Sequence, residues 1–304
     1  GPITRAEMAT ITGLVANAAS ISNLEGLEYC TNMTSLELES NSITDLSPLA
    51  NLTNLNYLDL YNNQITDVSA LSDLTNLNYL YLDSNQITGV SFSGFPVLNY
   101  LDLEDNQITS VSLTNMPEIQ YLYLNNNQIA DLSGISSLTN LAYLQLNLNL
   151  LTSVSALSNL TGLYNLYLSD QQLPSTATLT SLAGLSNMKN LTYLVASLNQ
   201  ITDISELAGL TSLYSVNLSN NAISDLSALT NLTGLSLLNL YNNPITDFTA
   251  LVDNTGLGLY HATVDLDEDV IGGVNQYPAE ATEVTEMQTA GVNVNVMDLS
   301  GLSY

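Results

Sequence analysis

Leucines recur along the chain in short alternating stretches that repeat at a nearly constant interval. In one such stretch, Leu58 and Leu60 alternate with residues of a different kind. This alternation predicts a short strand whose leucines point inward and whose intervening side chains point outward. From one central leucine to the next there are 21 or 22 residues, and once 28. The predicted strand centres are Leu14, Leu36, Leu58, Leu80, Leu101, Leu122, Leu144, Leu166, Leu194, Val216, Leu238 and, in a partial last unit, Tyr260.

An asparagine closes the turn after almost every predicted strand. Its amide carries donors and an acceptor, so we expect it to bond backbone groups of neighbouring coils. In the unit that contains Leu58, the apolar side chains of Ile65, Val68 and Leu71 then fill the rest of the interior. The asparagine column comprises Asn41, Asn63, Asn85, Asn106, Asn127, Asn149, Asn199, Asn221 and Asn243, and Gln171 takes this position in the 28-residue unit.

A sequence period in this range is typical of a solenoid, in which each coil buries its apolar face only by stacking on its neighbours. We therefore predict an α/β-type repeat solenoid of about 11 to 12 coils of about 22 residues. One side is expected to be a parallel β-sheet with strands about 4.8 Å apart. The opposite side is expected to consist of short 3-10 or irregular segments, and both ends should be capped.

The turn sequence after the strands follows the pattern N-x-I-x-D-[LIV]-S-x-L. It stands in the chain as Asn41–Leu49 and repeats with variations over roughly residues 11–257. In this pattern the chain resembles the bacterial internalin-type, or SDS22-like, class of leucine-rich repeats. The resemblance implies a horseshoe or arc whose concave side is the parallel sheet and binds proteins. It also implies a bacterial secreted or cell-surface protein, such as an adhesin, because many members of the class are found there.

The regularity of the repeat divides the chain into three predicted segments. Residues 1–30 would be an N-terminal cap with a degenerate first coil, residues 31–257 the repeats, and residues 258–304 a C-terminal capping segment. The extended repeat around 163–190 contains an insertion at 174–180, which we interpret as an enlarged convex loop or, alternatively, a dedicated partner contact. The two 21-residue units are expected to repack a shortened convex side with Phe92, Phe95, Pro96, Met116 and Pro117.

Both ends carry signals of capping elements. Thr4 and Glu7 have the spacing of a helix capping box. Near the other end, residues 279–290 are predicted to form one short helix ended by Gly291, and residues 292–296 a closing strand. This segment is expected to cover the open edge of the sheet.

Tyrosines dominate the outward positions of the predicted strands, a surface that we call the strand face. Eleven of the 17 tyrosines of the chain lie on it. Tyrosine favours strands and pairs well with its neighbours, so repeat duplication alone could have produced this array. Tyrosine is also a preferred recognition residue, since it offers a large rigid area and a polar tip. The tyrosines give way to small polar residues towards the C-terminus, whereas a purely structural array should run throughout.

The charge of the chain is strongly one-sided. It holds 29 acidic residues against two basic ones, Arg5 and Lys189, for a formal net charge of -27. Nucleic acid and anionic membranes are disfavoured as partners, because both require basic side chains. No apolar run is long enough for membrane insertion. The partner is expected to be a basic protein or one reached through bound cations. Adaptation to salty or calcium-rich surroundings is an equal alternative.

Recognisable catalytic groupings are missing. His261 is the only histidine and Cys30 the only cysteine, and no motif pairs either of them with a nucleophile or base. We expect Cys30 to be buried as a small apolar side chain. The sequence therefore predicts no enzyme and no cofactor. A calcium ion at Asp265, Asp267 and Asp269 is a minor alternative, because the glycine and distal glutamate of an EF-hand loop are missing.

These observations predict an extracellular module that binds a protein partner through a tyrosine-rich, acidic strand face. A carbohydrate-binding module with sugars stacked on tyrosines is the alternative, and a structural spacer or an ice-binding threonine column are lesser ones. The dipeptide Gly1-Pro2 is typical of a protease cleavage site, so we expect flanking segments and targeting signals beyond this sequence. The predicted partner-binding residues are Tyr57, Asp59, Tyr61, Tyr79, Tyr81, Asp83, Tyr100, Asp102, Glu104, Tyr121, Tyr123, Tyr143, Tyr167 and Tyr193.

Overall fold

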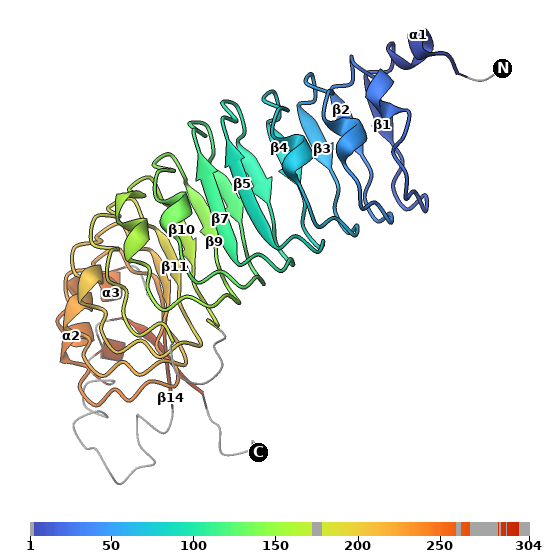
Figure 1. Cartoon of the computed structure of the whole chain (residues 1–304). Helices are drawn as coiled ribbons and strands as arrows, with labels where there is room; N and C mark the ends of the chain where they lie inside the picture. Colours follow the sequence, from blue (N-terminus) through green and yellow to red (C-terminus); the bar gives the residue numbers. More distant parts are fainter. Residues whose placement is uncertain are drawn as a thin grey trace, which may run out of the picture. The chain divides into compact units, whose positions relative to one another are not determined.

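The computed structural model of the chain consists of two compact units, residues 1–149 and residues 150–304. Each unit is a stack of coils that contributes one short strand per coil to a parallel sheet (Figure 1). The prediction of a leucine-rich-repeat solenoid is thus confirmed. The residues that the structure describes are 3–171, 178–259, 263–267, 285, 287–289 and 291–297.

The strands of the first unit pair in the register that the leucine period predicts. Leu36, Leu58 and Leu80 stand opposite one another on successive strands, and all three are fully buried. Each repeat therefore adds one strand in the same register as the strand before it. The strands of this sheet are β1 (Gly13–Val15), β2 (Ser35–Glu37), β3 (Tyr57–Asp59), β4 (Tyr79–Tyr81), β6 (Tyr100–Asp102), β8 (Tyr121–Tyr123) and β9 (Tyr143–Gln145).

The second unit continues the same scheme but ends differently from the prediction. Val264, not Tyr260, stands opposite Leu238, so the centre of the last repeat strand was predicted wrongly. The connection to this strand is longer because α2 (Thr249–Val252) and α3 (Thr255–Leu259) precede it. Tyr260 itself lies outside the described residues. The strands are β10 (Asn165–Tyr167), β11 (Tyr193–Val195), β12 (Ser215–Asn217), β13 (Leu237–Asn239), β14 (Thr263–Asp267) and β15 (Asn293–Met297).

Short 3-10 helices form the side opposite the sheet in most coils, as predicted. In several of them an aspartate two residues ahead, such as Asp67, accepts a hydrogen bond at 2.8 Å from the backbone N–H of the first residue, Ser69. This local bond favours a turn over a strand at that point. The 3-10 helices are η1 (Leu27–Tyr29), η2 (Ser47–Leu49), η3 (Ser69–Leu71), η4 (Ser133–Ile135), η5 (Ser155–Asn159), η6 (Ser205–Leu207) and η7 (Ser227–Leu229).

The two 21-residue coils replace the 3-10 helix with a five-residue strand. Strands β5 (Gly89–Ser93) and β7 (Ser110–Thr114) form a separate two-stranded parallel sheet. Val90 and Phe92 point inward and are buried, while Ser91 and Ser93 are exposed. The sequence predicts repacking here, but a second sheet was not predicted. The alternation of apolar and small polar residues over residues 89–93 is the signal that indicates it.

The asparagine column bonds the coils together, as predicted. The Nδ2 of Asn63 donates to the carbonyl oxygens of Leu38 at 3.0 Å and Leu60 at 3.1 Å, and its Oδ1 accepts from the N–H of Ile43. Gln171 replaces the asparagine and serves in the same way, because its Nε2 donates to the carbonyl of Leu168. One buried amide thus satisfies backbone groups that the turn leaves without a strand partner.

The predicted end elements are present where the structure describes them. Thr4 and Glu7 form the capping box of α1 (Arg5–Met8). Near the C-terminus, residues 285 and 287–289 are helical, and Gly291 follows with a φ of 91°. The strand predicted at 292–296 is β15, which pairs with β14. Residues 174–177 of the predicted insertion, His261 and Asp269 lie outside the described residues.

Candidate functional site

The predicted site residues fall on both units, and most lie on the first. Twelve of the fourteen predicted residues project from β3, β4, β6, β8 and β9, or from the two positions that follow these strands. Tyr167 on β10 and Tyr193 on β11 belong to the second unit. The strand register brings the residues of the first unit into adjacent columns of tyrosine rings and carboxylates.

Seven tyrosines on the strand face of the first unit form one continuous array of ring contacts, here called the tyrosine array. Tyr81 contacts Tyr57 with ring centroids 5.6 Å apart and Tyr100 at 4.8 Å. Tyr123 likewise contacts Tyr100 at 5.1 Å and Tyr143 at 5.2 Å. These separations suit favourable aromatic packing. The array comprises Tyr57, Tyr79, Tyr81, Tyr100, Tyr121, Tyr123 and Tyr143.

The array exists because the repeat places two tyrosines on alternate strands. Tyr79 and Tyr81 both lie on β4, separated by the inward Leu80. The neighbouring strand β6 supplies Tyr100 opposite Tyr79, and Tyr81 bridges between the strands. Tyr79 and Tyr121 remain about two-fifths exposed, at 40% and 38%. The rings of the array therefore pack against one another, while those of Tyr79 and Tyr121 remain accessible to a partner.

Two buried carboxylates are embedded in the array at equivalent positions. Asp59 and Asp102 are 6% and 9% exposed. In each, Oδ1 accepts a hydrogen bond from the backbone N–H two residues on, and Oδ2 accepts from the hydroxyl of the tyrosine two residues before. For Asp102 that hydroxyl belongs to Tyr100, at 3.2 Å. Burial raises the pKa of Asp102 to about 6 despite these bonds.

Asp83 lies among these charges, and its carboxylate bonds the backbone N–H of its own residue. Burial, together with the negative charges of Asp102, Asp59 and Glu104, raises its pKa to about 7. Within the described residues, its side chain makes no hydrogen bond to another residue. Burial and the nearby Asp59 also raise the pKa of Glu39. We call Glu39, Asp59, Asp83, Asp102 and Glu104 the carboxylate row.

The tyrosine hydroxyls around the carboxylate row stay protonated in the neutral range. Burial raises the pKa of Tyr57, Tyr81 and Tyr100, and the nearby carboxylates add to the effect. The hydroxyl groups therefore act as neutral hydrogen-bond donors and acceptors. The strand face of the first unit combines aromatic area, fixed hydroxyls and desolvated negative charge.

Two neutral residues that sequence reasoning did not select complete the array towards β9. Asn125 donates to Glu104 Oε2 at 3.1 Å and also to Gln145, and Gln145 donates to the hydroxyl of Tyr143. Both occupy the same columns as the predicted residues, so column position was the signal that could have found them. The carboxylate row thus ends at Glu104, and amides replace acids beyond it.

The second unit carries a smaller aromatic pair. Tyr193 contacts Tyr214 with ring centroids 5.9 Å apart, and the two rings are 40% and 43% exposed. Tyr214 precedes its strand and was not predicted. Tyr167 lies at an outward position of β10 and is half-buried. The strand-face residues on β12, Ser215 and Asn217, are small and polar.

Among the described residues, no three His, Cys, Asp or Glu side chains are arranged to hold a metal ion. Cys30 is fully buried, as predicted. The calcium prediction at Asp265, Asp267 and Asp269 stays a prediction, because Asp269 lies outside the described residues. No helix in the described part of the chain is both long and apolar enough to cross a membrane.

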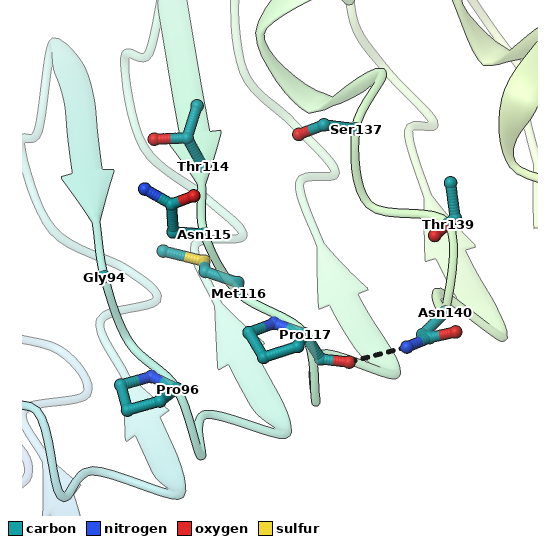
Figure 2. Close-up of a pocket in the computed structure, with 9 residues that line it drawn as sticks. All are labelled: Gly94, Pro96, Thr114, Asn115, Met116, Pro117, Ser137, Thr139 and Asn140. Atoms are coloured by element: carbon teal, nitrogen blue, oxygen red, sulfur yellow. Dashed lines mark hydrogen bonds between the residues drawn. The ribbon is translucent and has the colours of Figure 1, made fainter.

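A separate cavity of about 820 Å³ lies where β5 and β7 end, and no residue of the tyrosine array lines it (Figure 2). Pro96, Met116 and Pro117 give it an apolar wall, and Asn140 donates a hydrogen bond at 2.7 Å to the carbonyl of Pro117. Its lining holds no titratable side chain, so it offers no acid, base or charged anchor.

The repeat geometry and comparisons with known proteins define the class of this protein as leucine-rich repeat. Residues 31–87 match the family described as leucine rich repeat, and residues 96–138, 117–159 and 189–231 match the family described as leucine rich repeats in two copies. A search of curated protein sequences found no match.

Solved structures identify the family within that class. An internalin, inlF from Listeria monocytogenes, is 30% identical, with 98% of this chain and 85% of that chain covered and a TM-score of 0.77. The chain belongs to the internalin-like family of leucine-rich-repeat proteins. The leucine-rich repeat domain of APL1B shares the fold, at 17% identity over 93% of this chain and 72% of that one, with a TM-score of 0.61. A structure of the LRIM1/APL1C complex also shares the fold, at 18% identity over 86% of this chain and 54% of that one, with a TM-score of 0.65.

Proposed function

We propose that this protein binds another protein through the strand face of its first unit. The observation that carries the proposal is the tyrosine array, a rigid aromatic surface with hydroxyl groups and an adjoining carboxylate row in which Asp59 and Asp102 are buried. Rigid tyrosines lose little conformational entropy on binding and offer both apolar and polar contacts. Internalin-like membership supports a binding module rather than an enzyme.

The packing of the rings favours a protein over a sugar as the ligand. Sugar stacking needs a free ring face, but the rings of Tyr81, Tyr100 and Tyr123 pack against one another. We propose further that the partner is basic or bridged by cations, since the whole chain has only two basic residues. Secretion or display on a bacterial surface fits the similarity to an internalin, and protease accessibility on intact cells tests it.

A panel of purified extracellular domains, probed with the full chain, tests the binding function. The informative variant is the double change Tyr79→Ala and Tyr121→Ala. These two rings are among the most exposed in the array, so their removal should cost little stability but remove accessible contact area. Binding to any true partner should weaken at least about tenfold, as expected when interface anchors are truncated.

The control is Tyr164→Ala, which removes a tyrosine that is 52% exposed and lies one residue ahead of β10. Partner binding should survive this change, and both variants should melt close to the parent protein. Binding that is indifferent to Tyr79 and Tyr121 would refute the strand face as the site. Hits on a glycan array that disappear with the double change would instead support carbohydrate recognition.

A further inference from the structure

Asp83 stands out within the carboxylate row because, among the described residues, its carboxylate accepts a hydrogen bond only from its own backbone N–H. Asp59 and Asp102 each use both oxygens, one on a backbone N–H and one on a tyrosine hydroxyl. Glu104 accepts from Asn125. Asp83 makes no comparable bond within the described residues, although it lies at an equally central position.

The surroundings of Asp83 combine an exposed ring with further negative charge. Tyr61 and Glu104 occupy the corresponding position on the two neighbouring coils, as the backbone bonds from Asn62 to Asp83 and from Ser84 to Glu104 show. The ring of Tyr61 is 39% exposed. A guanidinium group suits such a place, because it stacks on aromatic rings and bonds a carboxylate through two parallel N–H groups.

The chain itself has no cation for this position. It contains one arginine and one lysine. The guanidinium of Arg5 lies 4.3 Å above the ring of Tyr29, and the Nζ of Lys189 donates to the carbonyl of Gly209 at 3.1 Å. A cation that complements the charge of Asp83 must therefore come from a binding partner.

We propose that Asp83 receives the guanidinium group of an arginine on the protein partner, with Tyr61 beside it and the rest of the carboxylate row around it. This inference rests on the proposed function and names the recognition chemistry of the same face. The arginine belongs to an extended segment of another protein, whose remaining contacts fall on the tyrosine array.

This arrangement makes binding dependent on pH in the neutral range. The charged groups that face Asp83 are Asp59, Asp102 and Glu104, all acidic. Burial, together with these charges, raises the pKa of Asp83 to about 7. Below that pH the carboxyl is protonated and cannot accept a guanidinium as an ion pair. Binding of the arginine therefore releases a proton near pH 7, and the complex weakens as the pH falls towards about 5.5.

The experiment begins with a random-peptide library displayed on phage and selected on the full chain at about pH 8. Selected peptides should be enriched in arginine. A chosen peptide is then compared with its copy in which citrulline replaces the arginine, since citrulline is neutral and of nearly the same shape. We expect the citrulline copy to bind about tenfold more weakly to the parent protein. Calorimetry near pH 7, in buffers of different ionisation enthalpy, should detect the released proton.

The decisive variant is Asp83→Asn, with Asp73→Asn as the matched control. Both remove one negative charge, but Asp73 is exposed on the loop after η3 and away from the strand face. Asp83→Asn should abolish the difference between the arginine and citrulline peptides and the proton release, and Asp73→Asn should preserve both. The folded-state pKa of Asp83 is raised, so the parent loses stability as the pH rises through 4 to 7, and Asp83→Asn should melt higher than the parent above pH 7.

The outcomes separate the two proposals. Peptides that lose binding with the Tyr79 and Tyr121 change but show no arginine enrichment, or tolerate citrulline, would overturn the role of Asp83 and leave the strand face as the site. Peptides whose binding is unaffected by the double change Tyr79→Ala and Tyr121→Ala would contradict the proposed function itself. An arginine effect that persists in Asp83→Asn would assign the guanidinium to another carboxylate and overturn this inference.

Discussion

At the scale of single residues, the buried amide of the asparagine column has the clearest physical role. Asn149 is fully buried, and its Nδ2 donates to the carbonyls of Leu124, Leu146 and Asn147 at 2.8 to 3.2 Å. Its Oδ1 accepts from the N–H of Ile129. No water can take over these bonds in a dry turn, so loss of the amide leaves buried polar groups unpaired.

Asn149→Ala should therefore destabilise the protein by about 2–4 kcal/mol, more than a typical single substitution. Urea denaturation followed by circular dichroism measures the change. Asn140→Ala is the control, because Asn140 is exposed and makes one bond, to Pro117. It should cost less than about 1 kcal/mol. Equal losses from the two variants would mean that burial of the amide bonds is not what matters.

Residue positions on the strand face could be predicted from sequence, but their interactions could not. Alternation placed Tyr81 and Asp83 on the outward side of the sheet, and the structure agrees. That the carboxylate of Asp83 bonds no other described residue depends on which hydroxyl and backbone groups lie within reach, and no spacing rule shows that. Asn125 and Gln145 were not predicted, because only charged and aromatic residues were selected and neutral amides in the same columns were left out.

At the scale of elements, the repeat period predicted every strand centre up to Leu238 because each coil must present a leucine to its neighbours. It failed where a coil changed length. The shortened coils formed β5 and β7 instead of 3-10 helices, and the helical segments α2 and α3 shifted the last strand centre to Val264. A fixed period carries no information about such changes, whereas local alternation at Gly89–Ser93 does.

The 3-10 helix η4 packs closely against β7 in the first unit. A Cβ on Gly134 in η4 would lie 1.8 Å from the carbonyl oxygen of Val111 and 2.9 Å from its carbonyl carbon. Both contacts are with backbone, which cannot swing aside as a long side chain can. The glycine therefore allows a coil with a 3-10 helix to pack directly against a coil with a strand.

Gly134→Ala should force η4 away from β7 and destabilise the protein by about 2 kcal/mol, the usual scale of overpacking. Gly13→Ala on β1 is the control, because its new Cβ would lie 3.8 Å from the carbonyl of Ser35, an ordinary contact. Thermal melting followed by circular dichroism should show a clear loss for the first and little change for the second. A neutral Gly134→Ala would show that the coils can separate there at no cost.

At the scale of the whole molecule, the charge of -27 acts on folding and on binding in opposite directions. In the folded chain, like charges are held close together in the carboxylate row, where burial and, to a smaller extent, the neighbouring carboxylates raise the pKa of Asp83 and Asp102. The unfolded chain spreads them apart. Salt screens this repulsion and should favour the folded state. Salt also screens the attraction between the carboxylate row and a basic partner, so it should weaken the complex.

Raising sodium chloride from about 10 mM to about 500 mM shortens the screening length from roughly 30 Å to a few ångström. The melting temperature of the free protein should rise over this range, while partner affinity falls by about tenfold or more. Sucrose is the control, because it stabilises by exclusion from the surface and leaves charges unscreened. If salt raised both stability and affinity, apolar burial would dominate the interface, and the carboxylate row would have no part in attracting the partner.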